Sequence, residues 1–437
     1  MNIELINTGS ELMLGRVLNS HQQWLCRRLS DLGHTVVRQV AVADVAADIQ
    51  QAVREALGRA NVVITTGGLG PTSDDLTREL ISELLGRKLV ENEAVRKHID
   101  NRFAKRGRPR PVTTQVENFV PEGALVFLNA FGTAPGLAME VGAGVSDLAS
   151  GTTQGEQHIS LEPKSKIPSP QWLIMLPGPP RELRPMFDDQ VVPLLKHEFA
   201  GEKFVYRMLR TTGLGESHVQ ELVQADLQPL AGRGLNVGYC ARPGAVDVRL
   251  TASGADAEQI VQQGESVVQR ILGANIFGFD DEEIEAVVVK ALRARKRMLA
   301  LAESCTGGNI AHRLTNVPGA SEIFLGGVVS YANEAKMALL GVRPESLAAH
   351  GAVSEVVAGE MALGARAKFG ADFALAVTGI AGPGGGTPEK PVGTVFIALA
   401  SAAGVEVKRF LNAWERETFK QVTATQALDW LRRTVSA

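Results

Sequence analysis

The sequence predicts an α/β protein built from several domains. Apolar, strand-like runs alternate with helical patterns along most of its 437 residues, and this alternation is typical of sheets covered by helices. The length suits two to four domains, each with a core of its own. Glycine is abundant (45 residues), whereas aromatic residues make up only 5% of the chain, a composition that fits α/β folds with many tight turns.

Charge and cysteine content argue against several classes of protein. The formal net charge is -3, so no overall charge draws the chain to nucleic acid or to an acidic membrane. The three cysteines are far apart and form no CxxC motif, which disfavours a disulfide framework or a structural zinc site. The first residues begin a strand rather than a signal peptide, and no apolar run is long enough to cross a bilayer. We therefore expect a cytoplasmic protein with no membrane partner.

Residues 1–198 are expected to form a doubly wound sheet. Helix and strand patterns alternate: strand Ile3 to Asn7, helix Asn19 to Leu32, strand Thr35 to Val42, helix Asp48 to Arg59, and strand Val62 to Thr66. The last of these strands is apolar throughout, as central parallel strands are. Ligands of such sheets bind at the carboxyl ends of the strands.

A glycine-rich loop follows that strand directly. It reads Gly67-Gly68-Leu69-Gly70-Pro71-Thr72-Ser73-Asp74-Asp75-Leu76-Thr77 and leads into a helix. Glycines before a helix make a nest for phosphate, and Asp74 and Asp75 are candidates to hold a divalent cation that bridges to it. The alternative is that the aspartates only cap the helix and complement its dipole. We favour phosphate or nucleotide binding because the loop lies between a strand and a helix.

Three further stretches of this domain carry weaker signals. The basic stretch from Arg96 to Arg110 is interpreted as a solvated helix face, because only Phe103 interrupts it and nothing else is present to stack bases. The loop from Asn129 to Leu137 is a candidate wall of the glycine-loop pocket. Residues 142–170 are polar and are interpreted as an exposed excursion, after which Trp172 to Leu176 returns as a strand.

Residues 199–279 show a different order of elements. The pattern is strand, helix, strand, strand, helix, strand, which is typical of a small split βαβ module. Some modules of this kind bind RNA, but no Gly-x-x-Gly loop joins the helices here. We favour a connecting or dimerising role.

The last domain, residues 280–437, contains the clearest chemical signal. A buried strand, Met298 to Ala302, leads through Glu303-Ser304-Cys305-Thr306-Gly307-Gly308 into a helix from Asn309 to Leu314. The glycines allow close approach of a ligand, and a hydroxyl nucleophile in this turn would have backbone donors for an oxyanion beside it. The alternative is an ordinary strand-to-helix turn capped by Ser304 or Thr306.

The nucleophile would need a base, and Lys336 is the best candidate. The strand from Phe324 should end at Ser330, so that Tyr331, Asn333 and Lys336 lie at the same sheet edge as Ser304. A desolvated lysine has a lowered pKa and accepts a proton from a hydroxyl, while Tyr331 would relay or orient it. The residues alone leave the alternative of a solvated lysine and a packing tyrosine, which is the commoner outcome.

The rest of this domain is expected to complete an α/β fold. The predicted elements are helix Asn333 to Leu340, helix Ser354 to Phe369, strand Phe373 to Thr378, strand Pro391 to Ala400 and helix Thr418 to Thr434. Between the last two strands the loop Gly379 to Gly386 is rich in glycine, and it is a candidate phosphate-binding loop together with Arg416.

Ordered motifs run through the whole chain. In the first domain they are Thr8-Gly9-Ser10-Glu11-Leu12, the stretch Thr66 to Thr77, Gly132-Thr133-Ala134-Pro135-Gly136 and Leu176-Pro177-Gly178-Pro179-Pro180-Arg181-Glu182. In the last domain they are Ala302 to Gly308, Tyr331-x-Asn333-x-x-Lys336, His350-Gly351-Ala352-Val353-Ser354 and Thr378-Gly379-Ile380-Ala381-Gly382-Pro383. On these motifs the chain closely resembles the CinA family along nearly its full length.

The resemblance implies two activities, of which the activity of the last domain is the firmer. The last domain looks like a nicotinamide-nucleotide amidohydrolase, which converts nicotinamide mononucleotide to nicotinate mononucleotide and ammonia without a cofactor. The first domain looks like a molybdopterin-binding fold, associated in this family with metal-dependent ADP-ribose pyrophosphatase activity. The middle module is similar to a KH fold, and the family tends to form homodimers. The alternatives are a non-catalytic adaptor in competence or DNA-damage response and a molybdopterin-binding protein; the charge and scarce aromatics argue against direct nucleic-acid contact.

The motifs carry the expected site residues. The catalytic set is Ser304, Lys336 and Tyr331, and the substrate-binding set is Glu303, Thr306, Gly307, Gly308, Asn333, Thr378, Gly379, Gly382 and Arg416. The second site comprises Glu11, Asp44, Gly67, Gly68, Gly70, Thr72, Asp74, Asp75 and Thr77, with Asp75 as the candidate ligand of a divalent metal. Where the family has Gly-Asp-Arg before its last helix, this chain has Ala413-Trp414-Glu415-Arg416.

Overall fold

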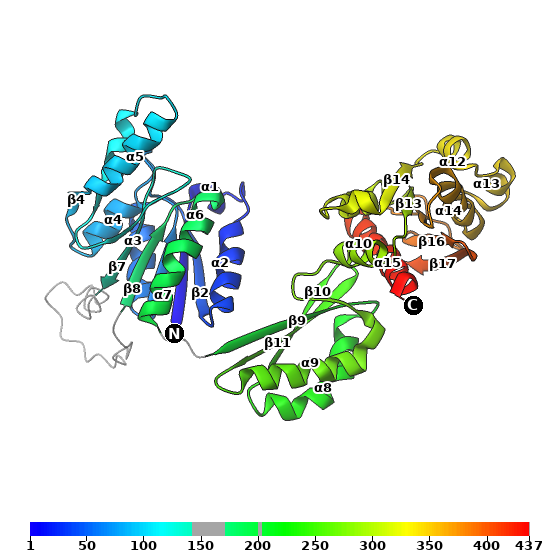
Figure 1. The fold of residues 1–437 in the computed structure, drawn as a ribbon, viewed down its shortest axis with the longest axis horizontal. Coiled ribbons are helices and arrows are strands. Elements are labelled where there is room, and N and C mark those ends of the chain that lie inside the picture. The colour runs from blue at the N-terminus through cyan, green and yellow to red at the C-terminus, as the bar shows by residue number, and fades with distance from the viewer. Residues whose placement is uncertain (142–170, 200–202, 437) are drawn as a thin grey trace. The chain divides into compact units, whose positions relative to one another are not determined.

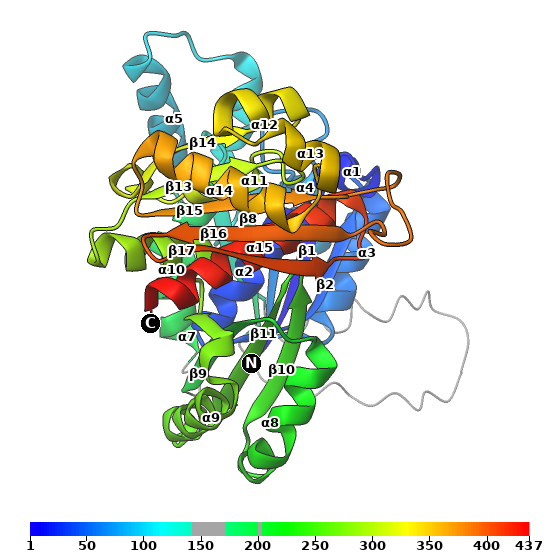
Figure 2. The ribbon, with the colours of Figure 1, turned by 90° about the vertical axis from the view of Figure 1, so that its right-hand side faces the viewer.

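The computed structural model describes residues 1–141, 171–199 and 203–436. They form two compact units: one contains residues 1–204 with 253–255, and the other contains 205–252 with 256–437. Each unit is described by itself (Figures 1 and 2). Residues 142–170 lie outside the described ranges, so their interpretation as an exposed excursion stays a prediction.

A six-stranded sheet with the order β2-β1-β3-β8-β7-β6 forms the centre of the first unit. The four strands from β2 to β8 run parallel, as the doubly wound prediction requires. The sequence did not reveal the two further strands: β7 is antiparallel to β8, and β6 is antiparallel to β7. The strands are β1 (Asn2–Thr8), β2 (Thr35–Val42), β3 (Val62–Thr66), β6 (Leu125–Phe127), β7 (Gly136–Val141) and β8 (Gln171–Leu176); β4 (Leu89–Glu91) and β5 (Phe119–Pro121) pair separately.

Helices cover both faces of this sheet (Figure 1). They are α1 (Ser10–Met13), α2 (Ser20–Asp31), α3 (Ala46–Leu57), α4 (Thr77–Leu84), α5 (Glu93–Lys105), α6 (Pro180–Met186) and α7 (Val192–Glu198), with a 3₁₀ helix at Val112–Asn118 and a π-helical turn at Phe187–Val191. The strands alternate: Val62 and Ile64 pack with α2, α6 and α7, whereas Val63 packs with α3, α4 and α5. Both faces are therefore buried, and loops at the strand ends are left to form a site.

The second unit begins with a four-stranded sheet of order β10-β11-β9-β12. Its elements are β9 (Phe204–Thr212), α8 (Glu216–Ala231), β10 (Asn236–Arg242), β11 (Ala245–Ser253), α9 (Ala257–Leu272), a short 3₁₀ turn (Gly273–Asn275) and β12 (Ile276–Phe279). The predicted order of strands and helices is thus confirmed. α8 and α9 lie side by side and share one core with the sheet (Figure 1).

The rest of this unit contains a five-stranded sheet of order β14-β13-β15-β16-β17. Its strands are β13 (Leu299–Glu303), β14 (Phe324–Val329), β15 (Phe373–Gly379), β16 (Thr394–Ser401) and β17 (Gly404–Leu411). Its helices are α10 (Ile284–Ala294), α11 (Asn309–Thr315), α12 (Asn333–Leu340), α13 (Pro344–His350), α14 (Glu355–Phe369) and α15 (Arg416–Ser436), with a 3₁₀ turn at Ala320–Glu322. The sequence had not indicated β17 or α13.

The sequence Leu-Ala-Leu-Ala of β13 explains how helices pack on the two faces of this sheet. Leu299 and Leu301 pack into the core formed with α10, α11 and α15, whereas Ala300 and Ala302 face α14. Small residues on the α14 face allow that helix to approach the sheet closely. β13, β14 and β15 run parallel, so their carboxyl ends meet at one edge. Within the described ranges, no helix has both the length and the apolar character needed to cross a membrane.

Candidate functional site

The loops after β13 and β14 meet at the carboxyl edge of the last sheet. The Ser304 N–H donates to the Val377 carbonyl of β15 (3.0 Å), and the Ser330 N–H donates to the Glu303 carbonyl of β13 (2.9 Å). Both loops are thus held by continuation of the strand hydrogen bonding. This arrangement brings the nucleophile candidate and the start of α12 together, as predicted.

Lys336 contacts Ser304 directly. Lys336 Nζ lies 3.0 Å from Ser304 Oγ, and the two side chains are only 1% and 8% exposed. Nζ also donates to the carbonyls of Ser330 (2.7 Å) and Tyr331 (3.3 Å). The alternative of a solvated lysine is therefore wrong.

The environment of Lys336 favours its neutral form. Burial lowers the pKa of the Lys336 amine from its ordinary value. A neutral amine keeps two N–H groups, which match the two carbonyl oxygens of Ser330 and Tyr331. Its lone pair is then left for the Ser304 hydroxyl, so Lys336 is placed to accept that proton.

Cys305 is an unsuitable nucleophile although it follows Ser304. Its side chain is buried, and burial raises the pKa of the Cys305 thiol to about 12. Since the thiolate is the reactive form, this thiol is inert near neutral pH. Ser304 therefore remains the candidate nucleophile of the loop.

Glu303 stabilises the turn that follows Ser304. Its buried carboxylate accepts hydrogen bonds from the N–H groups of Gly308 (3.0 Å), Ile310 (3.1 Å) and Ala311 (2.9 Å). We expected a substrate contact, but this carboxylate is committed to the backbone of the loop. The N–H groups of Cys305 and Thr306, directly after the nucleophile, are left as candidate oxyanion donors.

Tyr331 and Arg416 form the rim of this site. Arg416 donates to the Tyr331 hydroxyl (2.5 Å) and to the Gly382 carbonyl (2.8 Å), so the start of α15 is linked to two predicted loops. The Tyr331 side chain is 61% exposed, and its backbone carbonyl, not its hydroxyl, contacts Lys336. A proton relay through Tyr331 stays a prediction.

The other predicted residues of this domain surround the same edge. Thr378 is buried and donates to the Ala352 carbonyl (2.8 Å), whereas Asn333 is exposed at the first residue of α12. A Cβ on Gly379 would lie 2.8 Å from the Thr394 carbonyl oxygen, and one on Gly382 would lie 2.6 Å from Val392. These glycines are thus required by packing of the loop, whatever it binds.

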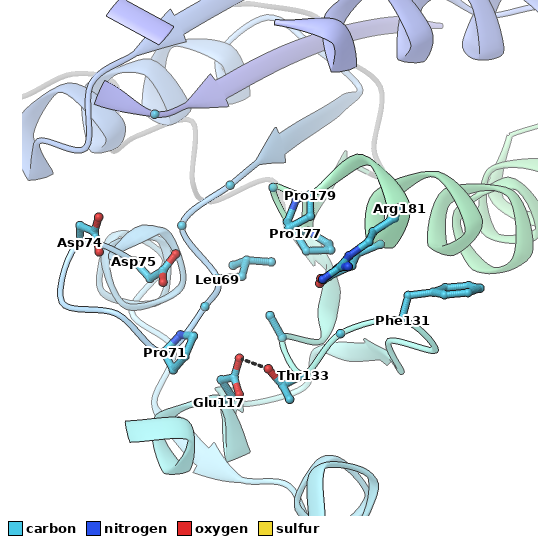
Figure 3. Close-up of a pocket in the computed structure, with 18 of the residues that line it drawn as sticks. Leu69, Pro71, Asp74, Asp75, Glu117, Phe131, Thr133, Pro177, Pro179 and Arg181 are labelled. Atoms are coloured by element: carbon cyan, nitrogen blue, oxygen red, sulfur yellow. Dashed lines mark hydrogen bonds and ion pairs between the residues drawn. The ribbon is translucent and has the colours of Figure 1, made fainter. Parts of the chain in front are cut away.

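A second candidate site lies in the first unit. A cavity of about 540 Å³ opens at the carboxyl ends of the parallel strands (Figure 3). Of the predicted residues, Glu11, Asp44, Gly67, Gly68, Gly70, Asp74 and Asp75 line it, as does the loop from Phe131 to Ala134. Thr72 and Thr77 are not among the lining residues; Thr72 donates through its N–H (3.0 Å) and its hydroxyl (2.5 Å) to the Asp75 carboxylate.

The glycine loop rests directly on its neighbours. Gly67 and Gly68 have φ values of +99° and +67°. A Cβ on Gly67 would lie 2.7 Å from the Thr8 carbonyl oxygen, and one on Gly68 would lie 2.0 Å from Thr77 Oγ1. Both positions therefore require glycine, and Thr77 supports the loop from behind.

Arginines make part of this cavity cationic. Arg102, Arg106 and Arg181 line it, and Arg102 donates to the carbonyls of Ala130 (2.9 Å) and Phe131. The interpretation of the whole basic stretch as a solvated face was therefore wrong for Arg102, whereas Arg106 is exposed as expected although it also lines the cavity. Guanidinium groups opposite a glycine loop suit a phosphorylated ligand.

Sequence reasoning missed Glu117, which lines the same cavity. Its side chain is 0% exposed. Thr133 Oγ1 donates to its Oε1 (3.0 Å; Figure 3), while Oε2 has no hydrogen-bond partner in the described part of the chain. Burial raises the pKa of the Glu117 carboxyl to about 7. Glu117 lies in the 3₁₀ helix Val112–Asn118, outside every motif, so no sequence pattern indicated its burial.

The carboxylates of the cavity do not form a metal centre by themselves. Among the described residues, no three His, Cys, Asp or Glu side chains converge closely enough to hold an ion. Asp44, Asp74 and Asp75 line the wall, and Asp44 accepts from the Ser10 N–H (2.7 Å). This arrangement fits an ion held by one or two carboxylates together with ligand phosphates, as Mg²⁺ often is. A divalent metal at Asp75 stays a prediction.

Fold and sites define a multidomain α/β protein with a molybdopterin-binding-like first domain, a KH-like module and a last domain that carries a buried Ser–Lys pair. Family models agree with this organisation: a probable molybdopterin binding domain matches residues 4–197, a damage-inducible protein CinA KH domain matches 206–278, and the CinA C-terminal domain matches 281–435.

Relatives match over the whole chain. A competence-damage inducible protein of Moorella thermoacetica is 41% identical over 100% of this chain and 99% of its own length. A CinA-like protein of Akkermansia muciniphila is 43% identical over 98% of this chain and 96% of its own. The chain belongs to the CinA family, which confirms the resemblance of its motifs. The crystal structure of competence damage-inducible protein A from Klebsiella pneumoniae is 42% identical and covers 35% of this chain and 95% of its own, with a TM-score of 0.34.

Proposed function

We propose that the last domain hydrolyses the carboxamide of nicotinamide mononucleotide to nicotinate mononucleotide and ammonia. The observation that carries the proposal is the 3.0 Å contact between the buried side chains of Lys336 (Nζ) and Ser304 (Oγ). Among the residues that the structure describes, no carboxylate forms an ion pair with this amine. A hydroxyl activated by a buried amine suits attack on an amide. The choice of nicotinamide mononucleotide as the amide is supported by what the resemblance of the motifs to the CinA family implies.

The reaction divides into two steps. In the first, Ser304 Oγ attacks the carboxamide carbon while Lys336 accepts the hydroxyl proton, and the N–H groups of Cys305 and Thr306 stabilise the oxyanion. The C–N bond then breaks, and ammonia leaves with the proton returned by Lys336. In the second step a water molecule gives a proton to Lys336 and attacks the ester carbon. Release of the nicotinate returns that proton to Ser304.

The test is ammonia release from nicotinamide mononucleotide by the full-length protein. Ser304→Ala should lower turnover by about 10³-fold or more, because no hydroxyl remains to form the ester. Lys336→Met removes the proposed base, and its matched control is Lys368→Met. Lys368 is exposed near the end of α14, away from the catalytic edge. Undiminished turnover in the Ser304→Ala protein would refute the mechanism, and no release by the unmodified protein would refute the activity.

A second activity, hydrolysis of the diphosphate of ADP-ribose in the first domain, is supported by Glu117. A buried carboxylate with a free oxygen is suited to take a proton from the water that attacks phosphorus. The glycine loop and the arginines would hold the diphosphate, and water attack would cleave one P–O bond of the anhydride. A bound divalent ion, with Asp75 as candidate ligand, would neutralise phosphate charge.

Phosphate release coupled to a phosphatase tests this second activity with ADP-ribose and Mg²⁺. Glu117→Gln keeps the size of the side chain and should lower kcat by about 10²-fold or more with little change in KM. Glu122→Gln, on an exposed residue of the same segment, is the control. Equal rates in the two variants would remove Glu117 from the reaction. Retention of a pterin by the purified protein would instead favour molybdopterin binding.

A further inference from the structure

Lys420 of α15 extends its ammonium group over the loop that follows Ser304. A Cβ built on Gly307 would lie 3.7 Å from Lys420 Nζ and 3.9 Å from Lys420 Cε, so the lysine packs against that glycine. The side chain is half-buried. In the described residues no carboxylate forms an ion pair with it and no acceptor takes a hydrogen bond from it, whereas Lys97 and Lys290 are paired with glutamates.

Lys420 lies on the same face of α15 as Arg416. The two residues are one helical turn apart, and side chains at that spacing are neighbours. Arg416 contacts Tyr331 and Gly382, while Lys420 lies against Gly307. The first turns of α15 therefore bring two cations to the loops that carry the catalytic pair.

The two cations differ in how much of their hydrogen-bonding capacity is free. Arg416 already donates to the Tyr331 hydroxyl and the Gly382 carbonyl. The N–H groups at the start of α11 are occupied by Glu303. An ammonium group has three donors and a compact charge, and those of Lys420 are uncommitted.

We propose that Lys420 binds the 5′-phosphate of the substrate and makes the last domain select a mononucleotide over the corresponding ribonucleoside. This inference rests on the proposed amidohydrolase activity. With the carboxamide at Ser304, the phosphate is the one anionic group of the substrate that a cation near the mouth of the site has to recognise. Lys420 is a binding residue in this reaction, and it takes no part in proton transfer.

The test compares nicotinamide mononucleotide with nicotinamide riboside, which lacks only the phosphate. Lys420→Met should lower kcat/KM for the mononucleotide by roughly 10- to 100-fold, the usual effect of losing a charge-assisted hydrogen bond. The loss should appear as a higher KM for the mononucleotide. The kcat/KM for the riboside should not change. Lys420→Arg should restore part of the preference, and Lys368→Met should behave like the unmodified protein.

Titration calorimetry of both compounds separates this inference from the proposed activity. Weaker binding of the mononucleotide alone in Lys420→Met supports the phosphate contact, even if the protein releases no ammonia and the proposed activity fails. Ammonia release with an unchanged preference for the mononucleotide overturns the role of Lys420 and leaves the activity standing. An equal loss of affinity for the mononucleotide and the riboside also overturns the role of Lys420, because a packing defect would weaken the binding of both compounds alike.

Discussion

Lys336 Nζ and Ser304 Oγ lie 3.0 Å apart although 32 residues separate them in the chain. Two parallel strands explain this proximity, because β13 and β14 end at the same edge of the sheet. Each loop continues from its strand without an insertion, and Ser330 remains hydrogen-bonded to Glu303. The pair is thus held by the sheet itself, which keeps the amine and the hydroxyl at reacting distance before substrate binds.

The pH dependence of ammonia release should report the proton of Lys336. Burial lowers the pKa of this amine below its ordinary 10.5, so activity should rise with pH through a limb that lies below that value. Lys336→Met should lower kcat by about 10²-fold or more and remove the limb. The measurement is kcat against pH for nicotinamide mononucleotide. A limb at or above 10.5, or one that persists in the variant, would contradict the assigned base.

The same pKa has a consequence for stability. Between the lowered pKa in the folded protein and the ordinary value in the unfolded chain, the unfolded chain binds more protons. The contribution of Lys336 to the free energy of unfolding should therefore rise with pH across that window and be constant below it. Thermal midpoints of the Lys336→Met protein, compared with the original at several pH values, should lack this rise.

Replacing Glu303 should loosen the catalytic loop. Glu303→Gln leaves one side-chain oxygen for three backbone N–H groups and removes the charge, so we expect a loss of about 2–3 kcal/mol in stability. Ammonia release should also fall, since the oxyanion donors belong to the same loop. Glu345→Gln, in the exposed first turn of α13, is the control. Equal unfolding midpoints for the two variants would show that Glu303 does not hold the loop.

The sequence was sufficient for features that depend on local pattern and on sheet topology. The apolar run from Met298 to Ala302 predicted β13, and the rule that parallel strands end at one edge placed Lys336 beside Ser304. The middle module followed from its order of elements in the same way.

Features that depend on distant contacts were not predictable. Glu117 is buried because Thr133 and the wall of the cavity close over it, and nothing in its own neighbours indicates this. Arg102 is likewise oriented by carbonyls of Ala130 and Phe131, far along the chain. The free ammonium of Lys420 depends on how α15 crosses the Gly307 loop.

A substitution in the glycine loop should separate the two sites. Gly68→Ala places a Cβ 2.0 Å from Thr77 Oγ1 at a φ of +67°, so both a clash and backbone strain are expected. Gly86→Ala has a similar φ of +63° but meets no atom within 4 Å, and should cost only about 1 kcal/mol. Gly68→Ala should therefore abolish ADP-ribose hydrolysis, while Gly86→Ala retains it. Ammonia release should be unaffected in both; a parallel loss of the two activities would contradict separate sites.

The buried carboxyl of Glu117 should make stability depend on pH. Its pKa is raised from 4.5 to about 7 in the folded protein, so the folded state holds the proton more tightly than the unfolded chain. The stabilising effect of that proton is complete below about pH 4.5 and is lost as pH rises through about 7. A shift of this size corresponds to at most about 3 kcal/mol.

Glu117→Gln cannot ionise, so it should escape this loss. Its stability relative to the original protein should therefore increase by up to about 3 kcal/mol between pH 5 and pH 8, as measured from denaturation midpoints of the first unit. Glu122→Gln, whose side chain is exposed, should show no such change. If the difference in stability between the Glu117→Gln protein and the original is the same at both pH values, the Glu117 carboxyl is ionised throughout this range. It would then have to be paired with a cation in solution, and the proton-accepting role in the first domain would lose its physical basis.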